Sequence, residues 1–165
     1  MISLQVAMQH TAWADEKLFR CLSALPDDAW RAKAQDDEWH VAALVFHLVA
    51  SADWYRYQLG GALIFDSEPQ SIAEVRALGD TWRELNADLV AECAKDEELM
   101  TFIDEDETKT AYRSIILTQA IVHSVEHRTQ IAAALKANGF ELPDLQDFSV
   151  WPFADVYGHQ MTKAE

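Results

Sequence analysis

The sequence has few residues that break helices, because its 165 residues include only 5 Gly and 4 Pro. Ala, Leu and Glu are common in it and favour helices, whereas a fold with many turns needs more Gly and Pro. The composition therefore argues against a many-turned β fold and predicts long helices. At this length we expect a single domain that covers residues 1–165 and encloses an ordinary core.

Positive charge is also scarce, since 13 Lys and Arg stand against 28 Asp and Glu and give a formal net charge of −15. Nucleic acids and anionic membranes both attract a basic surface, so we expect neither as a partner. No apolar run reaches the length of about 18 residues that a transmembrane helix needs. These absences leave a small-molecule substrate as the expected partner.

Cysteine is almost missing as well. Cys21 and Cys93 lie in separate helical stretches and form no CxxC motif, so we expect no disulfide framework. Residues 1–14 lack the basic-then-apolar layout of a signal peptide, and we expect a cytoplasmic protein. Neither cysteine is placed in a catalytic motif, so any thiol chemistry would need a thiol from another molecule.

Apolar residues recur at helical spacing in four stretches. The predicted helices cover residues 4–25, 36 or 37 to about 59, 71–95 and 112–137. Asp36 or Asp37 is the expected cap of the second helix, and Ser71 with Glu74 forms a capping box for the third. Four amphipathic helices of this length predict an all-α four-helix bundle, with connections long enough for a crossover.

Two segments fall outside this pattern. Residues 97–110 predict either a small hairpin or an extended loop. The tail at 143–165 is irregular but rich in aromatic residues, so we expect it to dock on the bundle.

A histidine pair organises the fourth helix. His123 and His127 are four residues apart, which on a helix means about 40° of rotation and roughly 6 Å of rise, so both rings leave one face. Such a pair can bind one divalent metal ion, and chance neighbours on a helix face are the plain alternative. A metal site would need a third ligand from elsewhere in the chain.

Four other histidines compete to be that ligand. His40 lies at the mouth of the second helix and His159 in the tail, so both are poorly placed. His10 and His47 both lie near the middle of a helix, and His47 has the more apolar setting, although a lone histidine there is also typical of a hydrogen-bonded core residue. Three neutral imidazoles plus water make an open, catalytic site, whereas cysteines usually close structural zinc sites.

The letters His-x-x-Glu-His also match the inverted zinc-protease motif, in which the glutamate is the general base. Such enzymes need a further carboxylate ligand well downstream, and little sequence follows His127. Glu126 is offset from His127 by about 100° and lies at the edge of the ligand face. We expect it to lie behind the ligands or on the surface.

Several segments, in this order and spacing, resemble the DinB/YfiT-like superfamily over nearly the whole chain. They are Trp-Ala-Asp-Glu-Lys-Leu at 13–18, Phe-His-Leu-Val-Ala-Ser-Ala-Asp-Trp at 46–54, His-x-x-x-His-Arg-x-Gln-Ile at 123–131, Leu135, and Gly-Phe-Glu-Leu-Pro at 139–143. The usual pattern after the last histidine is His-Arg-Gly-Gln, and Thr129 replaces that glycine here. The replacement leaves the histidines unchanged but alters the position where glycine would allow close contact between helices beside them.

The resemblance implies an up-down-down-up four-helix bundle, often dimeric, in which His47, His123 and His127 hold one divalent metal ion. Zinc and nickel are the metals we expect, and a homodimer is the expected assembly. Characterised relatives include thiol-dependent transferases and isomerases, in which the metal activates a low-molecular-weight thiol. The resemblance therefore indicates which residues form the site but does not indicate which substrate the protein acts on.

Three functions stay open at this point. A metal on three histidines lowers the pKa of bound water or thiol, so a thiol-dependent transferase is the first hypothesis. A metal-dependent hydrolase is the second, and a stress-associated binding protein whose metal only braces the bundle is the third. Asp53 and Arg128 are candidates for orienting or holding a substrate. We expect instead that Asp53 lies near the helix surface and that Arg128 pairs with a surface carboxylate.

Overall fold

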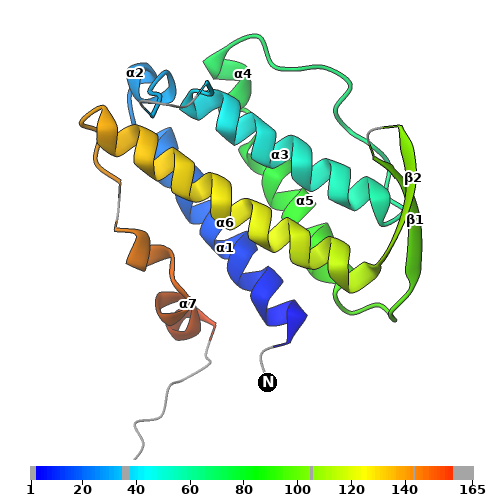
Figure 1. Cartoon of the computed structure of the whole chain (residues 1–165). Coiled ribbons are helices and arrows are strands. Elements are labelled where there is room, and N and C mark those ends of the chain that lie inside the picture. The colour runs from blue at the N-terminus through cyan, green and yellow to red at the C-terminus, as the bar shows by residue number, and fades with distance from the viewer. Residues whose placement is uncertain (1–2, 35–37, 105, 143, 158–165) are drawn as a thin grey trace, which may run out of the picture.

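The computed structural model describes residues 3–34, 38–104, 106–142 and 144–157, and helices make up most of it (Figure 1). Its elements are α1 (Leu4–Ser23), α2 (Asp27–Trp30), α3 (Val41–Gln58), α4 (Ile72–Arg76), α5 (Gly79–Glu92), β1 (Leu99–Asp104), β2 (Glu107–Tyr112), α6 (Arg113–Ala137), the 3₁₀-helix η1 (Leu145–Phe148) and α7 (Val150–Val156). The prediction of a mostly helical chain is confirmed, and the two strands are the exception.

The core lies among four helices. Helices α1 and α3 each contact both α5 and α6. Each of the four contributes leucines that are almost completely buried, among them Leu18, Leu44, Leu85 and Leu117. The apolar stripes predicted from the sequence thus face one another, and burial of such side chains is the main favourable term in folding.

Helix α1 matches its predicted span closely. Its first turn is capped by Ser3, whose hydroxyl accepts a hydrogen bond from the Val6 amide at 3.2 Å. The buried face of the helix carries Met8, Thr11, Asp15, Leu18 and Leu22. The two polar members of this stripe therefore lie among the helices and need polar partners there.

The second predicted helix needs a correction at its start. Helix α3 begins at Val41, not at Asp36 or Asp37, which lie outside the described residues. Nδ1 of His40 accepts a hydrogen bond from the Ala43 amide at 2.9 Å and caps the helix instead. An imidazole is an uncommon cap, so a search for Ser, Thr, Asp or Asn missed it.

The predicted helix at 71–95 is two helices, α4 and α5. Ser71 caps α4 as predicted, its hydroxyl accepting from the Glu74 amide at 3.2 Å. The chain then turns before Gly79, where an added Cβ would clash with Cε1 of Phe19. The Phe19 ring of α1 packs against the backbone at this point, and helical periodicity alone does not reveal that contact.

The stretch at 97–110 contains the hairpin, one of its two predicted alternatives. Strands β1 and β2 pair antiparallel, with Asp104 opposite Glu107 beside the turn. Arg113, the first residue of α6, forms ion pairs with Glu92 at the end of α5 and with Glu98 before β1. These contacts hold the hairpin against the helices that meet it.

The segment after α6 returns to α1. Phe148 and Phe153 are buried, and the Phe153 ring contacts the rings of His10 and Trp13.

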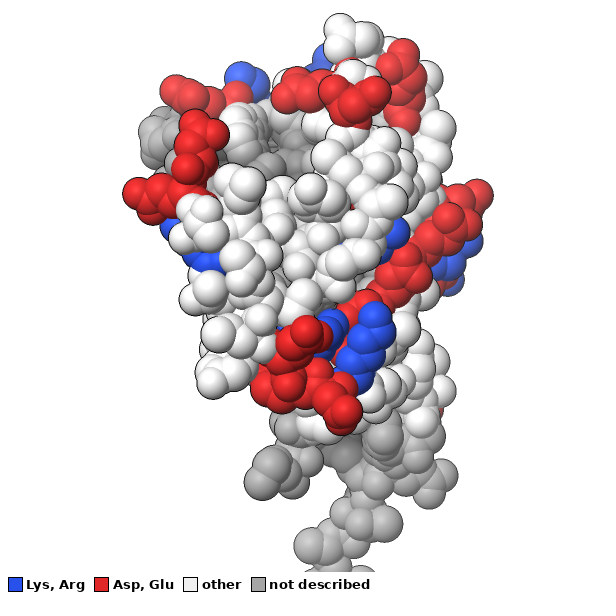
Figure 2. Space-filling view, turned by 90° about the vertical axis from the view of Figure 1, so that its right-hand side faces the viewer, with Lys and Arg blue, Asp and Glu red and all other residues white. Residues whose placement is uncertain are grey.

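Figure 2 shows more acidic than basic side chains on the face around the hairpin, with a mostly uncharged middle. Within the described residues, no helix has the length and apolar character that a bilayer crossing requires.

Candidate metal centre

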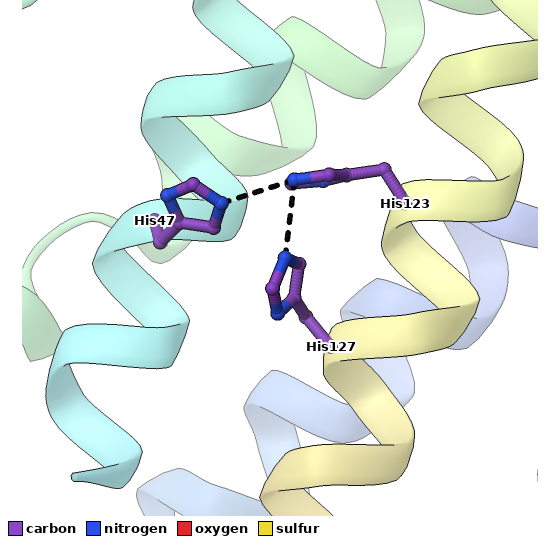
Figure 3. Close-up of side chains that lie close together, drawn as sticks. All are labelled: His47, His123 and His127. Atoms are coloured by element: carbon purple, nitrogen blue, oxygen red, sulfur yellow. Dashed lines mark hydrogen bonds between the residues drawn. The ribbon is translucent and has the colours of Figure 1, made fainter. Parts of the chain in front are cut away.

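Three histidines from two helices converge at one point (Figure 3). His47 comes from α3, and His123 and His127 come from successive turns of α6. Nε2 of His123 lies 3.0 Å from Nε2 of His47 and 3.1 Å from Nε2 of His127. One ring nitrogen from each residue lies within 4.8 Å of the other two. The structure thus brings together the three histidines that the family resemblance selected.

The spacing of these nitrogens suits a metal ion better than a hydrogen-bond cluster. An imidazole nitrogen offers one lone pair or one N–H, so Nε2 of His123 cannot make two good hydrogen bonds in its ring plane. In a tetrahedral zinc site with Zn–N distances near 2.0–2.1 Å, two ligand nitrogens lie about 3.3 Å apart. The observed distances of 3.0 and 3.1 Å are close to that value.

The protein surroundings keep two of these rings neutral. Burial, followed by repulsion from His127 and His47, lowers the pKa of His123 from 6.5 to about 4. The pKa of His47 is also lowered, by burial first and by His127 second. Both imidazoles are therefore uncharged at pH 7, which is the form that binds a metal.

Two further residues orient the rings, although no such role was predicted for either of them. Nδ1 of His127 donates to Oε1 of Gln130 at 2.5 Å, which leaves Nε2 of that ring with its lone pair. The Trp39 indole lies 4.6 Å from the His47 ring and 6.1 Å from the His127 ring, measured between ring centres, and stacks on the latter. The i, i+3 spacing could have identified Gln130, whereas Trp39 precedes α3 and gives no such signal.

A buried carboxylate holds α6 beside these histidines. Oδ1 of Asp15 accepts hydrogen bonds from the Ser124 hydroxyl at 2.6 Å and from Nη1 of Arg128 at 2.5 Å. Arg128 also donates to Ser124 at 2.7 Å, and Asn86 of α5 donates to the other Asp15 oxygen at 3.2 Å. All four residues are buried. Because Ser124 and Arg128 directly follow the two histidines of α6, this network sets which way the histidine face points.

The sequence matches the DinB family over residues 1–151, a span that includes all three histidines. The chain belongs to the DinB family. No curated protein sequence matches it. Family membership agrees with the resemblance drawn from the motifs, and the three-histidine group gives this DinB chain a place where a metal ion fits.

The predicted surroundings of Arg128 in this DinB chain were wrong. Arg128 pairs with a carboxylate, as expected, but the side chains of Arg128 and Asp15 are only 8% and 2% exposed. The partner is buried between helices and not on the surface. Asp15 is the signal that could have shown this, because a lone acid in an apolar stripe needs a buried partner.

The prediction for Asp53 was also wrong. Asp53 is 0% exposed and accepts hydrogen bonds from the amides of Ile64 at 2.7 Å and Phe65 at 2.9 Å. Arg56 also donates to it, at 3.1 Å. The carboxylate therefore folds the loop after α3 back onto that helix, a role that depends on backbone amides and leaves no pattern in the sequence.

The other candidates lie apart from the three-histidine group. Glu126 is exposed, and the described contacts of the three rings do not include it. Nε2 of His10 bonds the Phe148 carbonyl at 2.8 Å, and His40 caps α3. His159 lies outside the described residues. His47 is thus the histidine that the fold places beside His123 and His127.

We predict that Asp15→Ala destabilises the protein by about 3–5 kcal/mol, the usual loss when one partner of a buried ion pair is removed. The change leaves the Arg128 charge buried and unpaired, and urea denaturation measures it. Glu16→Ala is the matched control, because the Glu16 side chain is 42% exposed and its ion pairs are 4.0 Å long. We expect the control to stay within about 0.5 kcal/mol. Equal losses in the two variants would contradict this role for Asp15.

We also predict that acid destabilises the metal-free protein partly through His123. The unfolded ring has a pKa of 6.5 and the folded ring about 4, so between these values the unfolded chain binds more protons. The stabilisation from neutral His123 is therefore present above pH 6.5 and is lost as pH falls toward 4. Denaturation at several pH values should show a smaller loss in His123→Gln than in the parent. An NMR titration of His123 with a midpoint near 6.5 would refute the argument.

Proposed function

We propose that this DinB protein is a divalent-metal-dependent enzyme in which His47, His123 and His127 hold the ion. The observation that carries the proposal is the convergence of three ring nitrogens within 4.8 Å of one another. Among the described residues, no carboxylate or cysteine joins that group. Three histidine ligands leave coordination positions open, which is the arrangement of catalytic sites and not of structural ones.

Zinc or nickel suits this set of ligands, since imidazole binds both. A metal held by three neutral imidazoles supplies Lewis acidity and lowers the pKa of a bound water or thiol. The chain contributes the rest. Gln130 fixes the tautomer of His127, Trp39 covers the His47 and His127 rings on one side, and Asp15 holds α6 in place.

We further propose that the nucleophile is a low-molecular-weight thiol and that the reaction is a transfer to a small electrophile. The thiol of Cys93 supports this by being poorly suited to the task. Burial first, and Glu92 second, raise the pKa of Cys93 to about 11, and its thiol donates to the Leu89 carbonyl at 3.4 Å. A thiol in that state is almost entirely un-ionised at neutral pH, and only the thiolate is a strong nucleophile.

The bundle topology and the assembly belong to the same proposal. The four packed helices form an up-down-down-up bundle. In Figure 1, the colours of α1 and α6 progress toward the α2 end and those of α3 and α5 toward the hairpin, which supports this order. We propose a homodimer, with small molecules and not nucleic acid as partners. The acidic side chains in Figure 2 are consistent with that choice.

Metal content is the first test. The purified protein should carry close to one zinc or nickel ion per chain, measured by inductively coupled plasma mass spectrometry. His47→Ala, His123→Ala and His127→Ala should each lose it, while His10→Ala keeps it, because His10 bonds the Phe148 carbonyl away from the group. Full metal retention in His47→Ala would remove that residue from the ligand set.

Turnover is the second test. Metal-loaded protein is incubated with monochlorobimane and, in turn, glutathione, mycothiol and bacillithiol. The thiolate sulfur displaces chloride, and we expect one thiol to react faster than in protein-free buffer. His123→Ala should abolish the acceleration, and the Cys21→Ser/Cys93→Ser double variant should keep it.

Other outcomes assign the protein to another class. Hydrolysis of esters or amides by the same metal form, without thiol transfer, would favour the hydrolase hypothesis, with Glu126 as the first base to test. The non-catalytic hypothesis would be favoured if the protein shows neither activity and if protein ligands fill the remaining coordination positions of the metal.

A further inference from the structure

A cavity lies away from the three histidines. It has a volume of about 210 Å³ and is formed by α1, α6, η1 and the segment that leads into η1. In Figure 1 that segment runs on the side of α6 opposite α3. Most of its lining is apolar, from Leu18, Val125, Ala132, Leu142, Leu145 and Phe148. Benzene binds an engineered apolar cavity of about 150 Å³, so a molecule with one ring fits this volume.

Arg128 brings hydrogen-bond donors to the cavity wall. The residue is only 7% exposed, and Nη1 alone makes its bonds to Asp15 and Ser124. Among the described residues, no acceptor is bonded by its Nε or Nη2. Neither atom is among the fully buried, unpartnered atoms of the described residues, so both are accessible and free to donate to an oxygen atom of a molecule inside the cavity.

The charge around Arg128 decides what kind of oxygen this is. The Asp15 carboxylate already balances the guanidinium, at 2.5 Å. A carboxylate ligand would bring a second buried negative charge to a single cation, and uncompensated buried charge is costly. A neutral carbonyl oxygen accepts the free N–H groups without that penalty. The net charge of −15 also disfavours anions in general.

We propose that this cavity binds a small, uncharged, apolar molecule through one carbonyl oxygen that accepts hydrogen bonds from Arg128. The site is separate from the metal centre and does not depend on the reaction proposed there. It shares Arg128 with the Asp15 network, so its occupant touches the residue that follows His127.

Fluorine NMR of the full-length, metal-loaded protein tests the proposal with 4-fluoroacetophenone and 4-fluorobenzoate. The two probes share a ring and differ in charge. We expect the ketone to bind and the benzoate to bind at least about tenfold more weakly. Ala132→Phe fills the cavity and should abolish ketone binding. Ala133→Phe is the matched control, because Ala133 is the next residue of α6 and is exposed.

Two more variants separate this site from its surroundings. Arg128→Lys keeps a positive charge beside Asp15 but lacks the planar fork of donors, so ketone binding should weaken by about tenfold. His123→Ala should leave ketone binding unchanged, which distinguishes this site from the metal centre. The proposal is overturned if the ketone does not bind at millimolar concentration, if Ala132→Phe binds it as the parent does, or if the benzoate binds as tightly.

Discussion

The arrangement of the whole site depends on one buried carboxylate oxygen. Oδ1 of Asp15 binds both Ser124 and Arg128, which directly follow the two histidines of α6. A helix can rotate about its own axis when only apolar side chains hold it, because such packing tolerates repacking. Two hydrogen bonds to one fixed oxygen remove that freedom. The histidine face of α6 is thereby directed at α3, where His47 completes the group.

Burial gives the same network its strength and gives the histidines their chemistry. Charged hydrogen bonds in a low dielectric are strong when every partner is present, and leaving one unpaired is costly. The low dielectric also disfavours the charged form of His123, whose pKa falls to about 4. At neutral pH the fold therefore keeps His123 unprotonated, so that the lone pair of one ring nitrogen is free to bind a metal ion.

Much of the fold could be predicted from the sequence, because apolar spacing and helix-ending residues record helices directly. The i, i+4 spacing of His123 and His127 identified two members of the three-histidine group, and family resemblance, not spacing, selected His47 over His10. The missed features depend on contacts between distant segments. The hydrogen bond from Arg128 to Asp15 joins residues 113 positions apart, and Asp53 bonds backbone amides that any residue supplies. The cap at His40 and the break before Gly79 likewise depend on local geometry that periodicity does not encode.

X-ray absorption spectroscopy at the zinc edge of the zinc-loaded protein measures the ligand set directly. We expect three imidazole nitrogens as the main shell at about 2.0–2.1 Å, with one additional light atom in the remaining coordination position. A sulfur shell at about 2.3 Å, or a spectrum without imidazole scattering, would contradict the three-histidine site.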